Sequence, residues 1–359
     1  MNILFWVPYS SEGPSNRYRV EQYLPYLEKE GYAYNLRSFW SRDAYKILYK
    51  KGYFLKKFFY FIKGTFDRLT DLFFIFKYDM VFIHREAYPI GGIFFEKILV
   101  LLGKPYVFDF DDAIFAPSVS RQNSFIERFK DTRKIGAIIK GSRYVIAGNR
   151  YLADYSLRYN INTRIIPTAI DTDRYFPPAA KKTKAIVTIG WIGSGTTLEF
   201  LDDLKNVFLK ISREFGNSVE FKIVGGLFAM PGVLNLSSKE WSQKEELDDL
   251  NSFDIGIMPM PENEWTKGKC GFKAILYMSV GIPCICSAVG VNKEIISEGV
   301  NGYLASTEKE WLEKLSLLVK DAALRQRLAG QARKTIEEKY SLKINAPKFI
   351  KAIQDCYGK

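Results

Sequence analysis

Short apolar runs separated by amphipathic segments dominate the chain. Apolar runs of about four to eight residues between turn-forming residues are typical of buried strands, and a period of about 3.6 residues indicates a helix. The first run, Asn2–Pro8, precedes a small polar loop, Ser10–Ser15, and a helix-period stretch from about Arg17 to Gly31. Further strands are predicted at 80–84, 106–110, 144–147, from 185, and at 219–225, 255–259, 283–287 and 303–304. This alternation predicts parallel sheets with helices on both faces.

A linker-like stretch divides this pattern in two. Pro177 and Pro178 precede a polar, lysine-rich run, and a second strand, glycine loop and helix begin at Ala185. A length of 359 residues also favours two domains. We therefore predict an α/β fold with two Rossmann-like domains. The predicted segments are an N-terminal domain at 1–172, a linker at 173–183, a C-terminal domain at 184–338 and a last helical segment at 339–359 that could return to the N-terminal domain.

Composition narrows the kinds of partner. Lys and Arg number 52 against 40 Asp and Glu, which gives a net charge of +12, and aromatic residues reach 15%. Such a chain favours a polyanionic partner: nucleic acid, an anionic membrane or a phosphorylated substrate. The single histidine, His84, excludes a histidine-rich metal site, and the four cysteines lack the CxxC spacing of zinc sites. Composition therefore disfavours a zinc site.

The densest candidate chemistry lies between Trp265 and Pro283. A glycine-rich turn leads there into a predicted helix, and the backbone N–H groups at such a helix start form an anion site. Lys269 and Lys273 add two positive charges, which is a way to hold a diphosphate without a metal. The alternative is a solvated lysine pair on an ordinary loop–helix junction.

Several segments together resemble GT-B fold glycosyltransferases of family 4 (group 1), in a bacterial branch. These segments are DFDDAIF (109–115), AGNRYLADY (147–155), IIPTAIDTDRYFPP (165–178), GWIGSGTT (190–197) and the stretch 259–305. The resemblance covers essentially the whole chain in the family's order. It implies two Rossmann-like domains that face a central cleft, a nucleotide-sugar as co-substrate, retention of anomeric configuration and no essential metal or other cofactor.

The chain departs from that family at the donor site. Most members carry an E-x7-E pair, and the two positions fall here on Gly268 and Leu276, within and after the sequence GKCGFK. The family's Arg and Lys after the C-domain glycine loop are also missing. We hypothesise that Lys269 and Lys273 replace this basic pair. The predicted donor-binding residues are Gly193, Ser194, Gly268, Lys269, Cys270, Gly271, Phe272 and Lys273.

Acidic residues follow the predicted strand 106–110. Because ligands of open α/β sheets bind at the carboxyl ends of strands, we predict Asp111 and Asp112 as catalytic residues that bond a sugar hydroxyl. The alternatives are a structural cluster at the strand end, or a metal-binding DxD formed with Asp109 as in the unrelated GT-A glycosyltransferases, which the two-domain layout disfavours.

Basic residues near the ends of N-terminal strands are candidates for acceptor binding: Arg17, Arg19 and Arg85. Arg17 and Arg19 follow the first loop, where an acceptor phosphate would meet a helix start. They are equally consistent with surface arginines on an amphipathic helix. Arg85 follows the strand 80–84, whose last residue, His84, is either a site residue or a satisfied strand-end histidine.

Residues 44–66 contain six lysines, nine aromatic residues and no acid. At about 100° per residue the lysines gather on one side of a helix pair broken near Gly52, which is typical of an interfacial segment on anionic lipid. The alternative is a core-packed helix pair with a solvated lysine face. The predicted membrane-facing residues are Lys46, Lys50, Lys56, Lys57 and Phe58. No nucleic-acid-binding module is recognisable.

The resemblance and this segment together predict a transferase that moves a sugar from a nucleotide-sugar to a lipid-linked or saccharide acceptor. The expected context is bacterial surface polysaccharide or lipopolysaccharide synthesis. We expect a cytoplasmic protein on the inner face of the cytoplasmic membrane, since no signal peptide or spanning segment is predicted. Two other classes remain: a non-catalytic nucleotide- or glycan-binding protein and, less favoured, a nucleotide-sugar epimerase.

Overall fold

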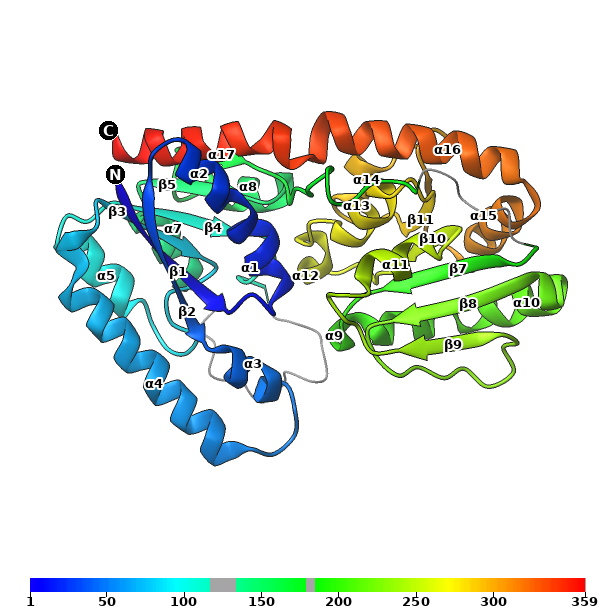
Figure 1. Cartoon of the computed structure of the whole chain (residues 1–359), viewed down its shortest axis with the longest axis horizontal. Coiled ribbons are helices and arrows are strands. Elements are labelled where there is room, and N and C mark those ends of the chain that lie inside the picture. Colours follow the sequence, from blue (N-terminus) through cyan, green and yellow to red (C-terminus); the bar gives the residue numbers. More distant parts are fainter. Residues whose placement is uncertain (117–133, 179–184, 359) are drawn as a thin grey trace. The chain divides into compact units, whose positions relative to one another are not determined.

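The computed structural model describes residues 1–116, 134–178 and 185–358. The chain forms two compact units (Figure 1). Unit 1 comprises residues 1–169 and 345–359, and unit 2 comprises residues 170–344. The boundary predicted at 172 falls near this division, and the predicted linker 173–183 lies partly outside the described residues.

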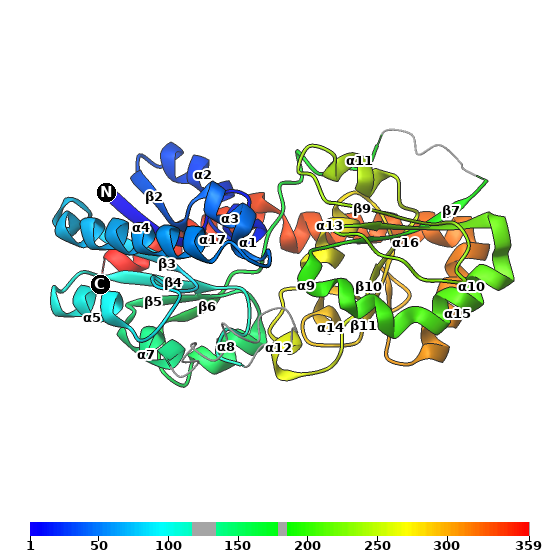
Figure 2. The same ribbon diagram turned by 90° about the horizontal axis from the view of Figure 1, so that it is seen from below.

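Unit 1 is built on a six-stranded parallel sheet in the order β2-β1-β3-β4-β5-β6. Its strands are β1 (Asn2–Tyr9), β2 (Ala33–Trp40), β3 (Met80–His84), β4 (Tyr106–Phe110), β5 (Tyr144–Ala147) and β6 (Thr163–Ile165). Helices lie on both faces of the sheet (Figure 2). Every residue of β3, β4 and β5 is therefore buried, as their mainly apolar sequences predict, including His84 and Asp109.

The helices of unit 1 differ from the predicted ones mainly at the start of the chain. The stretch predicted as one helix from Arg17 to Gly31 is α1 (Pro14–Arg19), a 3-10 turn and α2 (Leu24–Lys29). The remaining helices are α3 (Arg42–Leu48), α4 (Phe54–Phe73), α5 (Phe94–Leu101), α7 (Lys134–Gly141), α8 (Arg150–Ser156) and the C-terminal α17 (Leu342–Tyr357). The end of α17 belongs to unit 1, where Phe349 stacks on Tyr23 with ring centres 4.4 Å apart.

Unit 2 repeats this architecture with the strand order β12-β11-β10-β7-β8-β9, again all parallel. Its strands are β7 (Val187–Ile192), β8 (Val219–Val224), β9 (Leu236–Lys239), β10 (Ile255–Met258), β11 (Cys284–Ser287) and β12 (Tyr303–Ala305). Its helices are α9 (Gly195–Leu198), α10 (Lys205–Phe215), α11 (Glu246–Asn251), α12 (Glu264–Lys267), α13 (Phe272–Ser279), α14 (Asn292–Ile295), α15 (Glu308–Lys320) and α16 (Ala322–Thr335).

Glycines in the middle of two central strands of unit 2 let large rings pack on the sheet. A Cβ atom on Gly190 would lie 2.0 Å from the ring of Phe253, and one on Gly256 would lie 2.4 Å from the ring of Tyr277. Tyr277 lies on α13, so Gly256 sets how closely this helix approaches β10. A glycine of the sheet thereby sets the position of α13, the helix at whose start the candidate anion site lies.

The predicted fold class, α/β with two Rossmann-like domains of parallel strands, is confirmed. Three strands were not predicted: β2, β6 and β9. All three are edge strands of their sheets. An edge strand keeps polar residues on its solvent-facing side, so its sequence lacks the continuous apolar run of a buried strand. None of the helices in the described parts of the chain is long and apolar enough to cross a bilayer.

Candidate functional site

The predicted donor-binding residues of unit 2 lie in the loops that follow β7 and precede α13. The loop after β7 begins at Gly193, whose N–H donates to the carbonyl of Val224 at 2.9 Å. A Cβ on Gly225, which has φ +126°, would lie 2.0 Å from the Gly193 carbonyl oxygen. The loop can therefore cross the end of β8 only because Gly225 has no side chain.

Gly193 and Lys273 lie against each other, although eighty residues of sequence separate their elements. A Cβ on Gly193 would be 2.6 Å from Cε of Lys273, so the glycine makes room for the lysine stem. The Lys273 ammonium donates to Thr197 Oγ1 at 3.1 Å and lies 5.3 Å from the ring centre of Trp191. Burial, and then repulsion from Lys269, lowers the pKa of Lys273 to about 7.

Lys269 stands over an aromatic ring in the same way. Its ammonium lies 3.6 Å from the ring centre of Trp265, within the range of a cation–π interaction. Ser194, in the loop that precedes α9, is exposed, and its hydroxyl is 2.9 Å from that of Thr196. The positive charge of Lys269 also contributes to the lowered pKa of Lys273.

The start of α13 is the third part of this site. Gly271 caps the helix with a φ of +65°, a conformation that favours glycine, and as the cap residue it offers no side chain to the first turn. These groups and the helix dipole favour an anion there. Gly268, which ends α12, and Cys270 are buried, whereas Phe272 is half-buried. The structure thus brings the predicted residues together around one cationic helix start.

Three aromatic and hydroxyl side chains of this site were not predicted: Trp191, Thr197 and Trp265. Trp191 lies inside a strand and reads as a core residue, so its sequence position gives no sign of a contact with Lys273. Leu276, where the family would carry a ribose-binding glutamate, is a buried residue of α13. An apolar side chain therefore fills that position.

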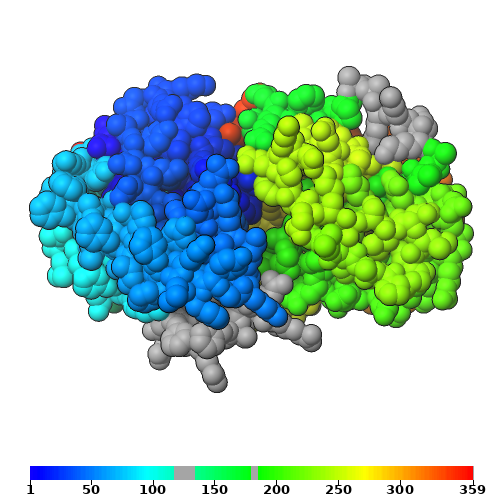
Figure 3. Space-filling view, turned by 60° about the horizontal axis from the view of Figure 1, so that its bottom comes forward, coloured from blue at the N-terminus to red at the C-terminus, as the bar shows by residue number. Residues whose placement is uncertain are grey.

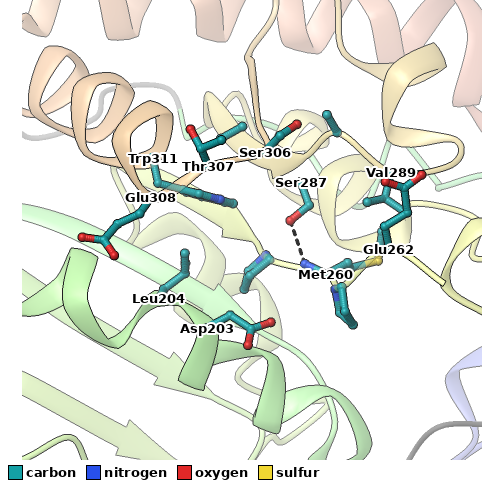
Figure 4. Close-up of a pocket in the computed structure, with 14 residues that line it drawn as sticks. Asp203, Leu204, Met260, Glu262, Ser287, Val289, Ser306, Thr307, Glu308 and Trp311 are labelled. Atoms are coloured by element: carbon teal, nitrogen blue, oxygen red, sulfur yellow. Dashed lines mark hydrogen bonds between the residues drawn. The ribbon is translucent and has the colours of Figure 1, made fainter.

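A pocket of about 260 Å³ opens at the carboxyl ends of β10, β11 and β12 (Figure 4). Asp203, Glu262, Glu308 and Trp311 are among the residues that line it, and the Met260 N–H donates to Ser287 Oγ at 2.8 Å. None of the predicted donor-binding residues lines it. Its volume is below the roughly 300–1,000 Å³ of typical ligand pockets, so it can hold at most part of a nucleotide-sugar.

In unit 1, the ends of β3 and β4 form a buried polar cluster with α1. Asp109 is fully buried and accepts hydrogen bonds from both Arg19 and His84, the latter with Nδ1 at 2.6 Å. His84 is fully buried too, and its Nε2 lies 2.6 Å from the Ser15 hydroxyl. His84 is therefore a satisfied strand-end histidine, one of the two interpretations of the sequence.

Asp111 lies at the exposed side of this cluster. Its carboxylate accepts from the Ser15 hydroxyl at 2.8 Å and from Arg85 Nε at 2.8 Å, and Arg85 also reaches Asp112 at 3.8 Å. Burial alone would raise the pKa of Asp111, but Arg85, with His84 and Arg19, holds it below its usual value. Arg85 itself has a φ of 65°, which is rare for a residue with a side chain.

The predicted acceptor-binding arginines have different surroundings. Arg85 keeps 21% of its side chain exposed, and Arg17 is half-buried with its guanidinium 5.5 Å from the ring centre of Tyr18. Arg19 is buried, with only 2% exposed, and its guanidinium donates to Asp109 and to the carbonyl of Ile166. Arg19 is therefore part of the buried ionic cluster, which contradicts the alternative of a surface arginine, and its contact with an acceptor phosphate stays a prediction.

The described residues hold no cluster of three or more His, Cys, Asp or Glu side chains suited to a metal. At the DFDD sequence, the neighbours of Asp109 and Asp111 are Arg19, His84 and Arg85. Arginine side chains on these carboxylates fit a polar and ionic network, which is the structural alternative considered above, better than a cation site.

Comparison with known proteins agrees with this architecture. Residues 257–335 match the family model "Glycosyl transferases group 1". Sucrose-phosphate synthase from Thermosynechococcus elongatus is similar with a TM-score of 0.74 and 14% identity, over 100% of this chain and 99% of that one. No curated protein sequence matches the chain at a significant level.

Two other solved structures contain ligands. HepE of Anabaena in complex with UDP and glucose gives a TM-score of 0.69 at 12% identity over 99% of both chains. TarM of S. aureus, in complex with fondaparinux, alpha-GlcNAc-glycerol and UDP, gives 0.57 at 16% identity over 80% of this chain and 58% of that one. The matched family segment includes α13 and supports the predicted enzyme class. The chain therefore has the GT-B fold of these glycosyltransferases, and its residues 257–335 match the group 1 glycosyltransferases.

Proposed function

We propose that this chain is a retaining, metal-independent glycosyltransferase. It moves a sugar from a nucleotide-sugar to a hydroxyl of a lipid-linked or saccharide acceptor, in bacterial surface polysaccharide or lipopolysaccharide synthesis. Unit 2 holds the donor and unit 1 the acceptor. The observation that carries the proposal is the pair of lysines at the start of α13, where Lys269 lies over Trp265 and Lys273 donates to Thr197.

The donor site would act mainly by electrostatics. In a retaining transfer of this kind the acceptor hydroxyl attacks from the face that the diphosphate leaves, and negative charge grows on the leaving oxygen. Two ammonium groups and the first-turn N–H groups of α13 would stabilise that charge without reorganising. Support for a nucleotide donor comes from the UDP that is bound in the HepE and TarM structures.

The binding test is a thermal-shift screen of the whole chain against UDP-, GDP-, dTDP-, ADP- and CMP-sugars. A donor present at about 100 times its Kd stabilises the folded chain by about 2.7 kcal/mol, which is a measurable rise in Tm. We expect one nucleotide class to give this rise, and the Lys269→Ala/Lys273→Ala variant to lose it. A screen in which no nucleotide-sugar raises the Tm would overturn the proposal.

Donor affinity should depend on pH through Lys273. Its folded pKa of about 7 lies below the ordinary value of 10.5, so the ammonium is partly deprotonated at neutral pH. A bound diphosphate favours the charged form, and binding above about pH 7 must therefore take up a proton. Titration calorimetry should show affinity falling from about pH 7 to about pH 9 by up to about tenfold per unit.

The Lys273→Arg variant serves as the control for this pH dependence, because an arginine stays charged throughout the range. Its affinity should be flat with pH.

The same pKa also predicts that the stability of the unliganded chain rises between about pH 7 and pH 10.5, because the unfolded lysine binds the proton that the folded one has lost. Equal pH profiles for the native chain and Lys273→Arg would contradict the assignment.

Asp111 is proposed to bond a sugar hydroxyl from unit 1. The Asp111→Asn change removes the negative charge but keeps the shape, so we expect transfer to fall about tenfold or more while donor binding by unit 2 stays unchanged. Rates of sugar transfer and donor affinity, measured on the same preparation, separate the two effects. If activity survives both Asp111→Asn and Asp112→Asn, this role is wrong.

A further inference from the structure

Helix α4 carries a row of large apolar side chains on its solvent side. We define this row as the apolar stripe; its members are Phe54, Leu55, Phe58, Phe59, Ile62, Phe66, Leu69 and Phe73. Leu55 is 86% exposed and Phe54 and Phe73 are each 79% exposed. Isolated exposed apolar residues are normal on a monomer, but a continuous row of this size marks an interaction surface.

The opposite face of α4 is fastened to the sheet of unit 1. A Cβ on Gly64 would lie 2.7 Å from the carbonyl oxygen of Phe39, so the helix touches the β2 backbone there. Arg68 is fully buried and donates to the carbonyls of Val7 and Ala87 at 3.1 and 3.0 Å. The helix therefore cannot rotate to bury the stripe without breaking these bonds.

The stripe is bordered by positive charge. At about 100° per residue it covers about 140° of the α4 surface, and Lys56 and Lys63 follow within about 60° of its edge. Lys63 pairs with Asp67 at 2.8 Å, so Lys56 is the lysine of this edge without an ion pair among the described residues. Lys50 and Lys51 stand exposed in the turn before the helix, and among the described residues they and Lys56 make no ion pair. Figure 3 shows the blue atoms of α3 and α4 exposed on the face turned to the reader.

We infer that the apolar stripe inserts into the interface of an anionic lipid bilayer, with the bordering lysines on the headgroups. An anionic bilayer binds a helix that inserts an aromatic face between the lipids and places its ammonium groups on the headgroups. A second copy of the chain fits less well, because stripe-to-stripe contact would bring the lysines of both copies together. The inference goes beyond the proposed transfer reaction and does not depend on it.

The structure changes the residues that the sequence assigned to lipid. Phe58 belongs to the stripe, and Lys56 borders it. Phe61, on the same helix but not among the predicted membrane-facing residues, faces the body of unit 1, with its ring centre 5.8 Å from that of Phe39 and 5.5 Å from that of Tyr88. Lys46 pairs with Asp43 at 3.1 Å on α3. The eight side chains of the stripe, which the alternative would pack in a core, are exposed.

The test is co-flotation of the purified whole chain with vesicles of phosphatidylglycerol and phosphatidylethanolamine, compared with vesicles of phosphatidylcholine. We expect binding to the anionic vesicles and at least about tenfold weaker binding to the neutral ones. The triple variant Phe54→Ser/Phe58→Ser/Phe66→Ser should lose about tenfold or more in affinity for anionic vesicles. Its folding should be unaffected, since all three side chains are exposed.

Two further variants complete the design. Lys50→Gln/Lys51→Gln/Lys56→Gln should reduce the preference for anionic vesicles and its sensitivity to salt. The matched control, Leu227→Ser/Leu234→Ser/Val300→Ser, removes exposed apolar residues from unit 2 and should bind vesicles like the native chain. All variants should keep the thermal shift with nucleotide-sugar, so a failure of vesicle binding is separate from a failure of the proposed reaction.

Three results would overturn the inference. One is a native chain that does not float with anionic vesicles, and another is a stripe variant that floats as well as the native chain. The third is a native dimer, measured by light scattering, that the stripe variant converts to monomer while vesicle binding is absent. In that case a second copy of the chain covers the stripe.

Discussion

The Lys269→Ala/Lys273→Ala double variant is expected to bind nucleotide-sugar about 100-fold more weakly than the native chain. A charge-assisted contact contributes about 1.5–3 kcal/mol, and about 1.4 kcal/mol corresponds to a tenfold change in Kd. Where both lysines are fully charged, each single variant should therefore lose about tenfold. The measurement is titration calorimetry with the nucleotide-sugar that stabilises the chain most in the thermal-shift screen.

The two lysines should not behave independently. The charge of Lys269 contributes to the lowered pKa of Lys273, so Lys269→Ala raises that pKa and strengthens the remaining lysine near neutral pH. Lys267→Ala is the matched control, because Lys267 lies two residues from Lys269 but pairs with Glu264 at 2.9 Å on the surface of α12. Unchanged affinity in both single variants would show that the lysines do not hold the diphosphate.

The Asp109→Ala variant is expected to lose about 3–5 kcal/mol of stability. Removing one partner of a buried ion pair leaves the other charge buried without compensation. In this chain Asp109 balances Arg19 and orients His84, and all three side chains are buried. Urea unfolding should show an earlier transition, and hydrogen exchange should locate the loosening in β3, β4 and α1 of unit 1.

A surface pair provides the comparison for this variant. Asp154 pairs with Arg150 at 2.9 Å, but both side chains are more than half exposed. Asp154→Ala should therefore change the free energy of unfolding by less than about 1 kcal/mol. If Asp109→Ala unfolds at the same urea concentration as the native chain, the cluster is not the ionic anchor of unit 1 that its burial indicates.

The central strands of both sheets could be predicted from sequence because they are buried on both faces. β3, β4 and β5 read as apolar runs in which only His84 at the end of β3 and Asp109 in β4 are polar, and such runs have few other interpretations. The edge strands β2, β6 and β9 alternate or stay polar, and a short alternating run is easily read as a loop. Their places are set by pairing with a neighbouring strand, which no local pattern records.

The donor site divides in the same way. A glycine turn before a helix is a local pattern, so the start of α13 and its lysines were predictable. Contacts between segments that are distant in sequence were not predictable. Thr197 and Trp191 contact Lys273 only because α9, β7 and α13 come together in the folded unit. For Arg19 the alternative of a surface arginine is wrong, because tertiary packing buries its side chain against Asp109.

The basic aromatic segment shows why periodicity needs the rest of the fold. The break near Gly52 was predicted and lies between α3 and α4, where Gly52 has a φ of +79°. Periodicity identifies an apolar side of α4 but not which part of it meets the sheet. That choice depends on Gly64 and Arg68, whose contacts lie in β1, β2 and the loop after β3.

The most direct test of the central claim is a transfer assay with the whole chain. The nucleotide-sugar selected by thermal shift is incubated with saccharide and lipid-linked acceptors, and the products are analysed by NMR in the presence and absence of EDTA. We predict that nucleoside diphosphate is released only with an acceptor, that the new linkage keeps the donor's anomeric configuration, and that EDTA has no effect. Isomerisation of the donor sugar without an acceptor, or binding without turnover across all donors and acceptors, would contradict the assignment of this chain as a glycosyltransferase.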